Sequence, residues 1–181
     1  MCYIYMPDFK KDLNRGQYYE YKALHILKSL DFTKIHHFKG KEPRYDIKAR
    51  FNKKKVYIEV KYNKSADKYN NFIIELSKAD GTPSGLSITK SNYYMLFSYS
   101  KYYLIETIKL HMIVKQYILN ALKEEGIQEP TPDIITNYIL NKTFNFYGYM
   151  CISLKLDLII PHCIKTDTHT NIKIKYIKND F

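Results

Sequence analysis

The amino-acid sequence predicts an α/β domain in which helices flank a mixed central sheet. Three observations lead to this prediction: helical periodicity near the N-terminus, strict apolar–polar alternation in the stretch that follows, and a second helical stretch after several strand-like segments. The chain has 181 residues, of which 45% are hydrophobic and 15% aromatic. This length and composition suit one domain over residues 1–181 with a sizeable core, and they argue against a disordered chain.

The first expected helix covers residues 16–30, and Asn14 is a suitable residue to cap its N-terminus. Its apolar residues at helical spacing are Ala23, Leu24, Leu27 and Leu30. A short strand is expected next, over residues 31–38, because Gly40 and Pro43 interrupt the chain soon afterwards.

The next stretch has the clearest pattern in the sequence. Residues 46–51 and 55–62 are expected to pair as a hairpin, joined by the basic turn 52–54. In the second strand, apolar residues at 56, 58 and 60 alternate with Tyr57, Glu59 and Lys61. One face of this strand is therefore expected to be buried, and the other to carry polar groups.

Further strands and two more helices are expected downstream. The expected strands cover residues 72–76, 92–99, 102–105, 146–160 and 172–177, with a turn over 80–85. The expected helices cover residues 107–125 and 134–140. The residues expected on one broad face of the first of these helices are Ile108, His111, Met112, Lys115, Ile118, Leu119 and Leu122.

Lysine and arginine number 29 against 18 acidic residues, which gives a formal net charge of +11. Such a surplus points to a polyanionic partner, and nucleic acid is favoured over an anionic membrane surface. A coding bias towards lysine, asparagine, isoleucine and tyrosine is the alternative interpretation.

Several classes of protein are excluded by what the sequence lacks. Its apolar runs are too short to span a bilayer, and its first residues do not resemble a secretory signal. Three cysteines are too few and too scattered for a disulfide framework, and no Walker-type phosphate loop is present. We therefore expect an intracellular protein that needs no membrane and no nucleotide cofactor.

Asp46, Glu59 and Lys61 form the pattern Asp-x12-Glu-x-Lys in the expected hairpin. Residues two apart in a strand point to the same face, so Glu59 and Lys61 project together and Asp46 can reach them from the partner strand. Two carboxylates on one face repel each other unless a cation lies between them, which suits Mg²⁺. An adjacent ammonium can stabilise charge on a phosphate, so the trio suits hydrolysis of a phosphodiester.

The same pattern occurs earlier in the chain, at Asp8, Glu20 and Lys22. There it lies in a stretch of helical periodicity, where residues two apart do not face each other. Context therefore favours the later match. An ordinary solvated strand face with a Glu–Lys pair remains the alternative for it.

Asp46, Glu59, Val60 and Lys61, with Gly16 and Glu20 in the preceding helix, resemble the PD-(D/E)xK nuclease superfamily, and in particular its archaeal-type Holliday junction resolvases and phage nucleases. Tyr45 stands where the motif has proline. A second block, from residues 71–75 through 81–86 to 92–94, resembles a segment of some phage-type members. The resemblance covers residues 13–99 and implies a restriction-endonuclease-like core. It assigns no role to residues 100–181, for which dimerisation and selection of substrate shape are the natural hypotheses.

The resemblance also implies roles for these residues. Asp46, Glu59 and the backbone carbonyl of Val60 would bind Mg²⁺, for which Mn²⁺ would substitute. Lys61 would position the attacking water or stabilise the phosphate, and Glu20 would reach the site from the first helix. Glu75 is a candidate for a further metal contact, although an ion pair with a surface lysine is an alternative role.

Candidate contacts to nucleic-acid phosphates lie on two loops, although ordinary solvated loops explain them nearly as well. The residues concerned are Lys53, Lys54 and Lys55 at the hairpin turn, and Ser84, Thr89 and Lys90 downstream.

The sequence thus supports a Mg²⁺-dependent DNA endonuclease, which would be a homodimer if it resolves branched DNA. The alternative is a non-catalytic basic module that binds nucleic acid, and an interaction protein is a third, less favoured class. Two carboxylates aimed at a polyanion would gain nothing for binding alone, so the first hypothesis is preferred.

Overall fold

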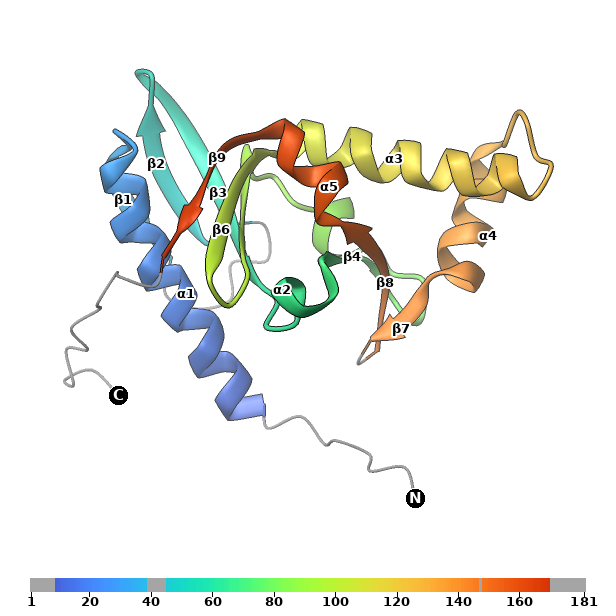
Figure 1. Ribbon diagram of the computed structural model, residues 1–181, viewed down its shortest axis with the longest axis horizontal. Coiled ribbons are helices and arrows are strands. Elements are labelled where there is room, and N and C mark those ends of the chain that lie inside the picture. Colours follow the sequence, from blue (N-terminus) through green and yellow to red (C-terminus); the bar gives the residue numbers. More distant parts are fainter. Residues whose placement is uncertain (1–8, 39–44, 147, 170–181) are drawn as a thin grey trace.

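The computed structural model describes residues 9–38, 45–146 and 148–169, and Figure 1 shows how the elements are arranged. The helices are α1 (Phe9–Ser29), α2 (Ala66–Tyr69), α3 (Thr107–Glu124), α4 (Pro132–Lys142) and α5 (Leu156–Ile159), with 3-10 turns η1 (Gly85–Ser87) and η2 (Ile160–His162). The strands are β1 (Thr33–His37), β2 (Ile47–Phe51), β3 (Lys54–Tyr62), β4 (Asn71–Lys78), β5 (Tyr93–Phe97), β6 (Lys101–Glu106), β7 (Phe144–Phe146), β8 (Tyr149–Lys155) and β9 (Cys163–Thr168). The strand expected over 172–177 lies outside the described residues.

A mixed six-stranded sheet forms the centre of the fold, as the sequence predicts. Its strand order is β1-β2-β3-β5-β6-β9, and β3 and β5 run parallel while the other neighbours are antiparallel. Alternation along β5 sends Met95 and Phe97 to the face covered by α1, and Tyr94 and Leu96 to the face covered by α3. Helices therefore flank the sheet on both sides (Figure 1).

A second sheet, of order β4-β8-β7, packs on the α3 side of the first. Phe72 and Ile74 of β4, together with Ile152 and Leu154 of β8, share one buried core with α3. The sequence predicts β4 as a strand but not that it leaves the central sheet. Among the described helices, none is long and apolar enough to cross a membrane.

The hairpin expected around residues 52–54 is confirmed. β2 pairs with β3 from Ile47 opposite Ile58 to Phe51 opposite Lys54, so the connection is only two residues long. Asn52 and Lys53 have φ angles of 50° and 65°. Two such residues in succession give the tight turn that matches the twist of the strands. The turn fixes the register that places the polar residues of β3 opposite those of β2.

The first helix starts earlier than expected. α1 begins at Phe9, so the expected start at Gly16 is wrong and Asn14 is an interior residue rather than a cap. A glycine inside a helix costs only about 1 kcal/mol relative to alanine. Packing of α1 against the central sheet outweighs a penalty of that size.

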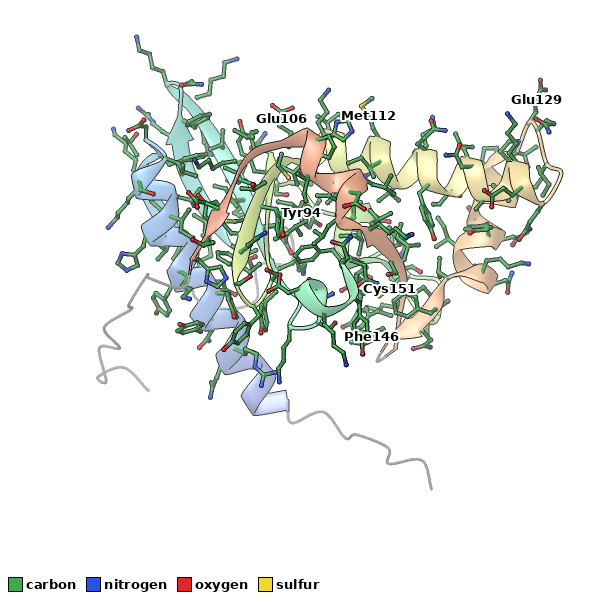
Figure 2. All side chains as sticks on the ribbon, viewed as in Figure 1. Tyr94, Glu106, Met112, Glu129, Phe146 and Cys151 are labelled. Carbon is green, nitrogen blue, oxygen red and sulfur yellow. The ribbon has the colours of Figure 1, made fainter. Side chains whose placement is uncertain are left out.

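The face that α3 buries agrees with the expected one only at Ile118 and Leu122. The buried stripe is Leu110, Val114, Ile118 and Leu122, spaced four apart, whereas Ile108 and Met112 are 63% and 58% exposed. Met112 points away from the fold in Figure 2. This helix carries two apolar stripes, and the position of the sheet decides which one is buried.

The expected strand over 146–160 is really three elements. β7 and β8 form a hairpin, and the chain then turns into α5, which buries Leu156 and Ile159. Buried residues three apart fit a helical turn and not a strand. β9, which pairs with β6, was not expected, because all but the first of its residues are exposed and lack alternation.

Candidate active site

The end of the β2–β3 hairpin opposite its turn carries the predicted trio. Asp46 directly precedes β2, and its backbone N–H donates to the carbonyl of Ile58, the residue before Glu59. Its Oδ2 accepts a hydrogen bond of 2.7 Å from the backbone N–H of Val60. Lys61 Nζ lies 2.9 Å from Glu59 Oε1. The structure therefore brings the two carboxylates and the ammonium together on one face of β3.

The same hydrogen bond indicates where the carbonyl of Val60 points. In an extended strand, the N–H and C=O of one residue point to the same edge. Because the N–H of Val60 points to Asp46, its carbonyl points to this edge too, just beyond the first paired residue of β2. The position agrees with the role that the resemblance implies for this carbonyl.

Burial raises the pKa of Asp46 to about 7, and nearby negative charge adds to the shift. Burial is the main cause and the charge of Glu59 the next, while the hydrogen bond from Val60 works in the opposite direction. Burial would lower the pKa of Lys61, but the charge of Glu59 outweighs it and holds that pKa above its usual value. The site therefore contains a permanent cation beside carboxylates that repel each other.

Glu20 joins the site from α1, on the opposite layer of the fold. Its Oε2 lies 2.5 Å from Nε2 of His37, and its charge contributes to the raised pKa of Asp46. His37 pairs with Ile47 in the β1–β2 ladder, one residue from Asp46. The helical Glu20 is thus near the trio, and His37 is a neighbour that the sequence pattern did not assign to the site.

Tyr94 is a second neighbour that sequence reasoning missed. It lies beside Glu59 in the parallel β3–β5 ladder and is 2% exposed. Burial raises the pKa of Tyr94, and the charges of Glu59 and Glu75 add to the effect. Figure 2 shows this side chain in the interior of the fold. Its sequence signal is its place in the 92–94 part of the block that resembles phage-type members, a likeness that gave it no role.

Glu75 lies half-buried in β4, opposite Cys151 of β8. Burial raises the pKa of the Cys151 thiol to about 11, and the charge of Glu75 adds to this. A Cβ on Gly85 would lie 2.5 Å from the carbonyl oxygen of Glu75. Close packing against β4 thus explains why a glycine stands at position 85.

The candidate phosphate contacts lie in different surroundings. Ser84 is buried, and Thr89 Oγ1 donates to Ser91 Oγ over 3.0 Å, whereas Lys90 is exposed. Lys53, Lys54 and Lys55 are exposed at the turn of the hairpin. Seven residues of extended strand separate Lys54 from Lys61, a distance of about 23 Å. Contacts from these three lysines would bind nucleic acid far from Asp46, Glu59 and Lys61.

The donor set fits a magnesium ion. Within the described residues, no three or more His, Cys, Asp and Glu side chains form a ready-made metal cluster. Mg²⁺ needs no such cluster, since it is commonly held by one or two carboxylates and completes its shell with water and substrate phosphate. Asp46, Glu59 and the carbonyl of Val60 would supply that minimal set, and a cation there would offset the burial and the charge of Glu59 that together raise the pKa of Asp46.

Comparison with known proteins gives one solved structure to report. No family model matches the chain, and no curated protein matches it. The structure of Hjc, a Holliday junction resolvase from the archaeal hyperthermophile Archaeoglobus fulgidus, aligns with a TM-score of 0.42 and 13% identity. The alignment covers 83% of this chain and 91% of that chain.

Proposed function

We propose that this protein is a Mg²⁺-dependent DNA endonuclease that hydrolyses phosphodiester bonds. The observation that carries the proposal is the convergence of Asp46, Glu59 and Lys61 on one face at the end of a hairpin. Two carboxylates and an ammonium at this spacing are what phosphodiester hydrolysis requires. The resemblance of these residues to the PD-(D/E)xK motif supports the same function.

Each residue would have a distinct role. Asp46, Glu59 and the carbonyl of Val60 would hold the ion, whose charge would stabilise the attacked phosphate and lower the pKa of a bound water. Lys61 is 42% exposed and has a raised pKa, so it remains protonated and reachable. We infer that Lys61 stabilises negative charge on the phosphate and does not act as the base that removes a proton from water.

Glu20 and His37 would support the site from its α1 side. Their contact of 2.5 Å orients the imidazole, and the charge of Glu20 adds to the acidic field around Asp46. Glu20 would thus act near the ion rather than as its main ligand. The fold places this pair beside the trio although 17 residues separate them in the chain.

DNA is the proposed substrate, because a net charge of +11 favours a polyanion and three exposed lysines lie at the turn of the same hairpin, at the end opposite the trio. Selectivity for a four-way junction is the finer part of this proposal and derives from the resemblance to junction resolvases. Resolution of a junction requires two cuts, so a homodimer would supply one site for each.

A specific contact favours a second candidate function. Lys61 already pairs with Glu59 at 2.9 Å, and an ion pair that neutralises a strand face needs no metal. A non-catalytic module that binds nucleic acid would show this same pair. In that case Glu59→Gln would leave DNA affinity unchanged or increase it, because a negative charge near the phosphates is removed.

The test is cleavage of two DNA substrates by the purified protein. Supercoiled plasmid and a synthetic four-way junction would be incubated with Mg²⁺, Mn²⁺ or EDTA. Cutting that needs the metal supports the nuclease, and preference for the junction supports the finer proposal. Tight, salt-sensitive binding to both substrates without cutting in either metal would favour the binding module.

A further inference from the structure

The three-stranded sheet has an outer face that points away from the core. In β8, Ile152 and Leu154 are buried in the core and Met150 is buried on the same side, so Tyr149, Cys151 and Ser153 lie on the other side, where Tyr149 is exposed and Cys151 is buried. We call this second side the outer face. Asn71 of β4 donates to Ser153 Oγ across it.

Three aromatic side chains gather on the outer face. Phe146 is paired with Tyr149, and Phe144 with Cys151; directly opposed residues of antiparallel strands share a face. The exposed fractions of Phe144, Phe146 and Tyr149 are 39%, 42% and 38%. All three belong to the β7–β8 hairpin, and Phe146 is labelled in Figure 2.

Such a group of rings is costly in water unless something binds it. The centroids of Phe144 and Phe146 are 6.3 Å apart, so the rings touch each other edge-to-face and still leave area exposed. Exposed apolar side chains that cluster on one surface mark interaction sites. The hairpin therefore presents a platform for a partner with flat apolar groups.

The charge beside the rings identifies that partner. Lys78 is exposed and stands directly opposite Tyr149 in the β4–β8 ladder, so an ammonium lies on the same face as the rings. The whole chain carries a charge of +11. Flat aromatic surface next to a cation suits a strand of unpaired nucleotides, whose bases stack while phosphates pair with lysine.

We infer that the outer face of the β4-β8-β7 sheet binds single-stranded nucleic acid. Bases stack on Phe146 and Tyr149, Phe144 supports the stack, and Lys78 contacts the backbone. Binding of this kind does not require cleavage.

The consequence for the substrate does rest on the proposed function. β4, which carries Lys78 and pairs with β8, follows β3 in the chain after only the short helix α2. The chain thus leads from the candidate active site directly into the sheet that carries the platform. Unpaired nucleotides beside the cleaved bond, as in a flap or an opened junction, would bind there.

Fluorescence anisotropy with a labelled oligothymidylate, in EDTA, tests the platform without cleavage. We expect Phe146→Ala and Tyr149→Ala each to weaken binding about fivefold or more, the range known for loss of one stacked base. Phe146→Tyr keeps a ring and should retain the affinity of the wild type. Tyr117→Ala is the matched control, since Tyr117 is 37% exposed but lies on α3.

Two results would overturn the inference. One is equal affinity of Phe146→Ala and the wild type for the oligonucleotide. The other is a loss of binding that accompanies a change in sedimentation from dimer to monomer, since the hairpin would then bind a second copy of this chain through its edge strand.

Plasmid cleavage in Mg²⁺ separates this inference from the proposed function. Phe146→Ala that cuts duplex plasmid normally but binds the oligonucleotide weakly supports both. Ring-dependent binding by a wild type that cuts no DNA would refute the nuclease and leave the platform supported. Normal cutting with ring-independent binding would refute only the platform.

Discussion

The carboxyl of Asp46 shows how one residue links the fold to the chemistry. Burial and the charge of Glu59 raise its pKa from 3.8 to about 7, against the hydrogen bond from the N–H of Val60. A bound metal would need Asp46 ionised, which is the form that burial disfavours. The arrangement therefore lowers the stability of the fold and raises the affinity of the site for a cation.

The pH dependence of stability follows from this shift. A folded-state pKa above the unfolded value means that the folded chain binds the proton more tightly between about pH 4 and pH 7. The free energy of unfolding should therefore fall as pH rises through that window. Asp46→Asn removes the titration but can still accept the hydrogen bond from Val60.

We predict that Asp46→Asn stabilises the protein in EDTA by on the order of 1–2 kcal/mol above pH 7, and much less near pH 4. Urea unfolding at both pH values measures the difference. A stability gain that is the same at both pH values would contradict the account, because the variant would then act through packing and not through charge.

At the scale of elements, Gly85 and Gly16 form a matched pair. Gly85 has a φ angle of 52°, and a Cβ there would lie 2.5 Å from the carbonyl oxygen of Glu75. Gly16 is helical and a Cβ there meets nothing within 4 Å. The same substitution should therefore have opposite effects at the two positions.

We expect Gly85→Ala to destabilise the fold by about 2 kcal/mol or more, since left-handed backbone and a clash with β4 add together. Gly16→Ala should stabilise α1 by up to about 1 kcal/mol. Thermal unfolding of both variants is the measurement. Equal melting temperatures would show that η1 does not pack on β4 as described.

A buried hydrogen bond also links the end of β9 to α1. Lys22 is 5% exposed, and its Nζ donates to Nδ1 of His169 over 2.9 Å. The Nε2 of His169 then carries the proton and donates to the carbonyl of Ser98 over 3.0 Å. Burial lowers the pKa of His169, and the charge of Lys22 adds to this effect.

A lowered pKa means that protonation of His169 favours the unfolded chain. Its stabilising contribution should be complete above its usual pKa of 6.5 and be lost as the pH falls below that value. We predict that His169→Gln is less stable than the wild type at about pH 8, and that the gap narrows at about pH 5. A gap that widens on acidification would contradict the assigned proton positions.

How much of the structure can be predicted from the sequence also differs from one element to the next. The β2–β3 hairpin is predictable because its alternation and its register are local. The buried face of α3 is not, since two apolar stripes compete and only the position of the sheet selects between them. The second sheet was missed for a related reason: β4 and β8 pair across more than 70 residues, and nothing local records that pairing.

At the scale of the whole molecule, the candidate site combines local and distant contributions. Asp46, Glu59 and Lys61 follow from spacing and strand geometry, and Glu20 follows from the resemblance. Tyr94 enters only through the parallel pairing of β3 with β5, and His37 only through the pairing of β1 with β2. Their absence from the sequence prediction reflects topology, which residue spacing does not encode.

The net charge of +11 predicts that the affinity for DNA falls as the salt concentration rises. If Lys53 and Lys54 contact phosphates, replacing both with glutamine should reduce the slope of log affinity against log salt by about 0.9 per contact on duplex DNA. Lys123→Gln on α3 is the control and should leave the slope closer to that of the wild type. Identical slopes for all variants would place the DNA away from the hairpin turn.

The central claim is that Lys61 stabilises charge during hydrolysis at a site formed with Asp46 and Glu59. Its most direct test is plasmid cleavage in Mg²⁺ by Lys61→Met, with Lys64→Met, an exposed lysine just beyond β3, as the control. We predict a loss of cleavage of about 100-fold or more for Lys61→Met. DNA binding in EDTA should stay close to that of the wild type and show that the variant is folded, while loss of the ion pair to the buried Glu59 should lower the melting temperature. Full cleavage by Lys61→Met would contradict the account and remove the trio as the hydrolytic centre.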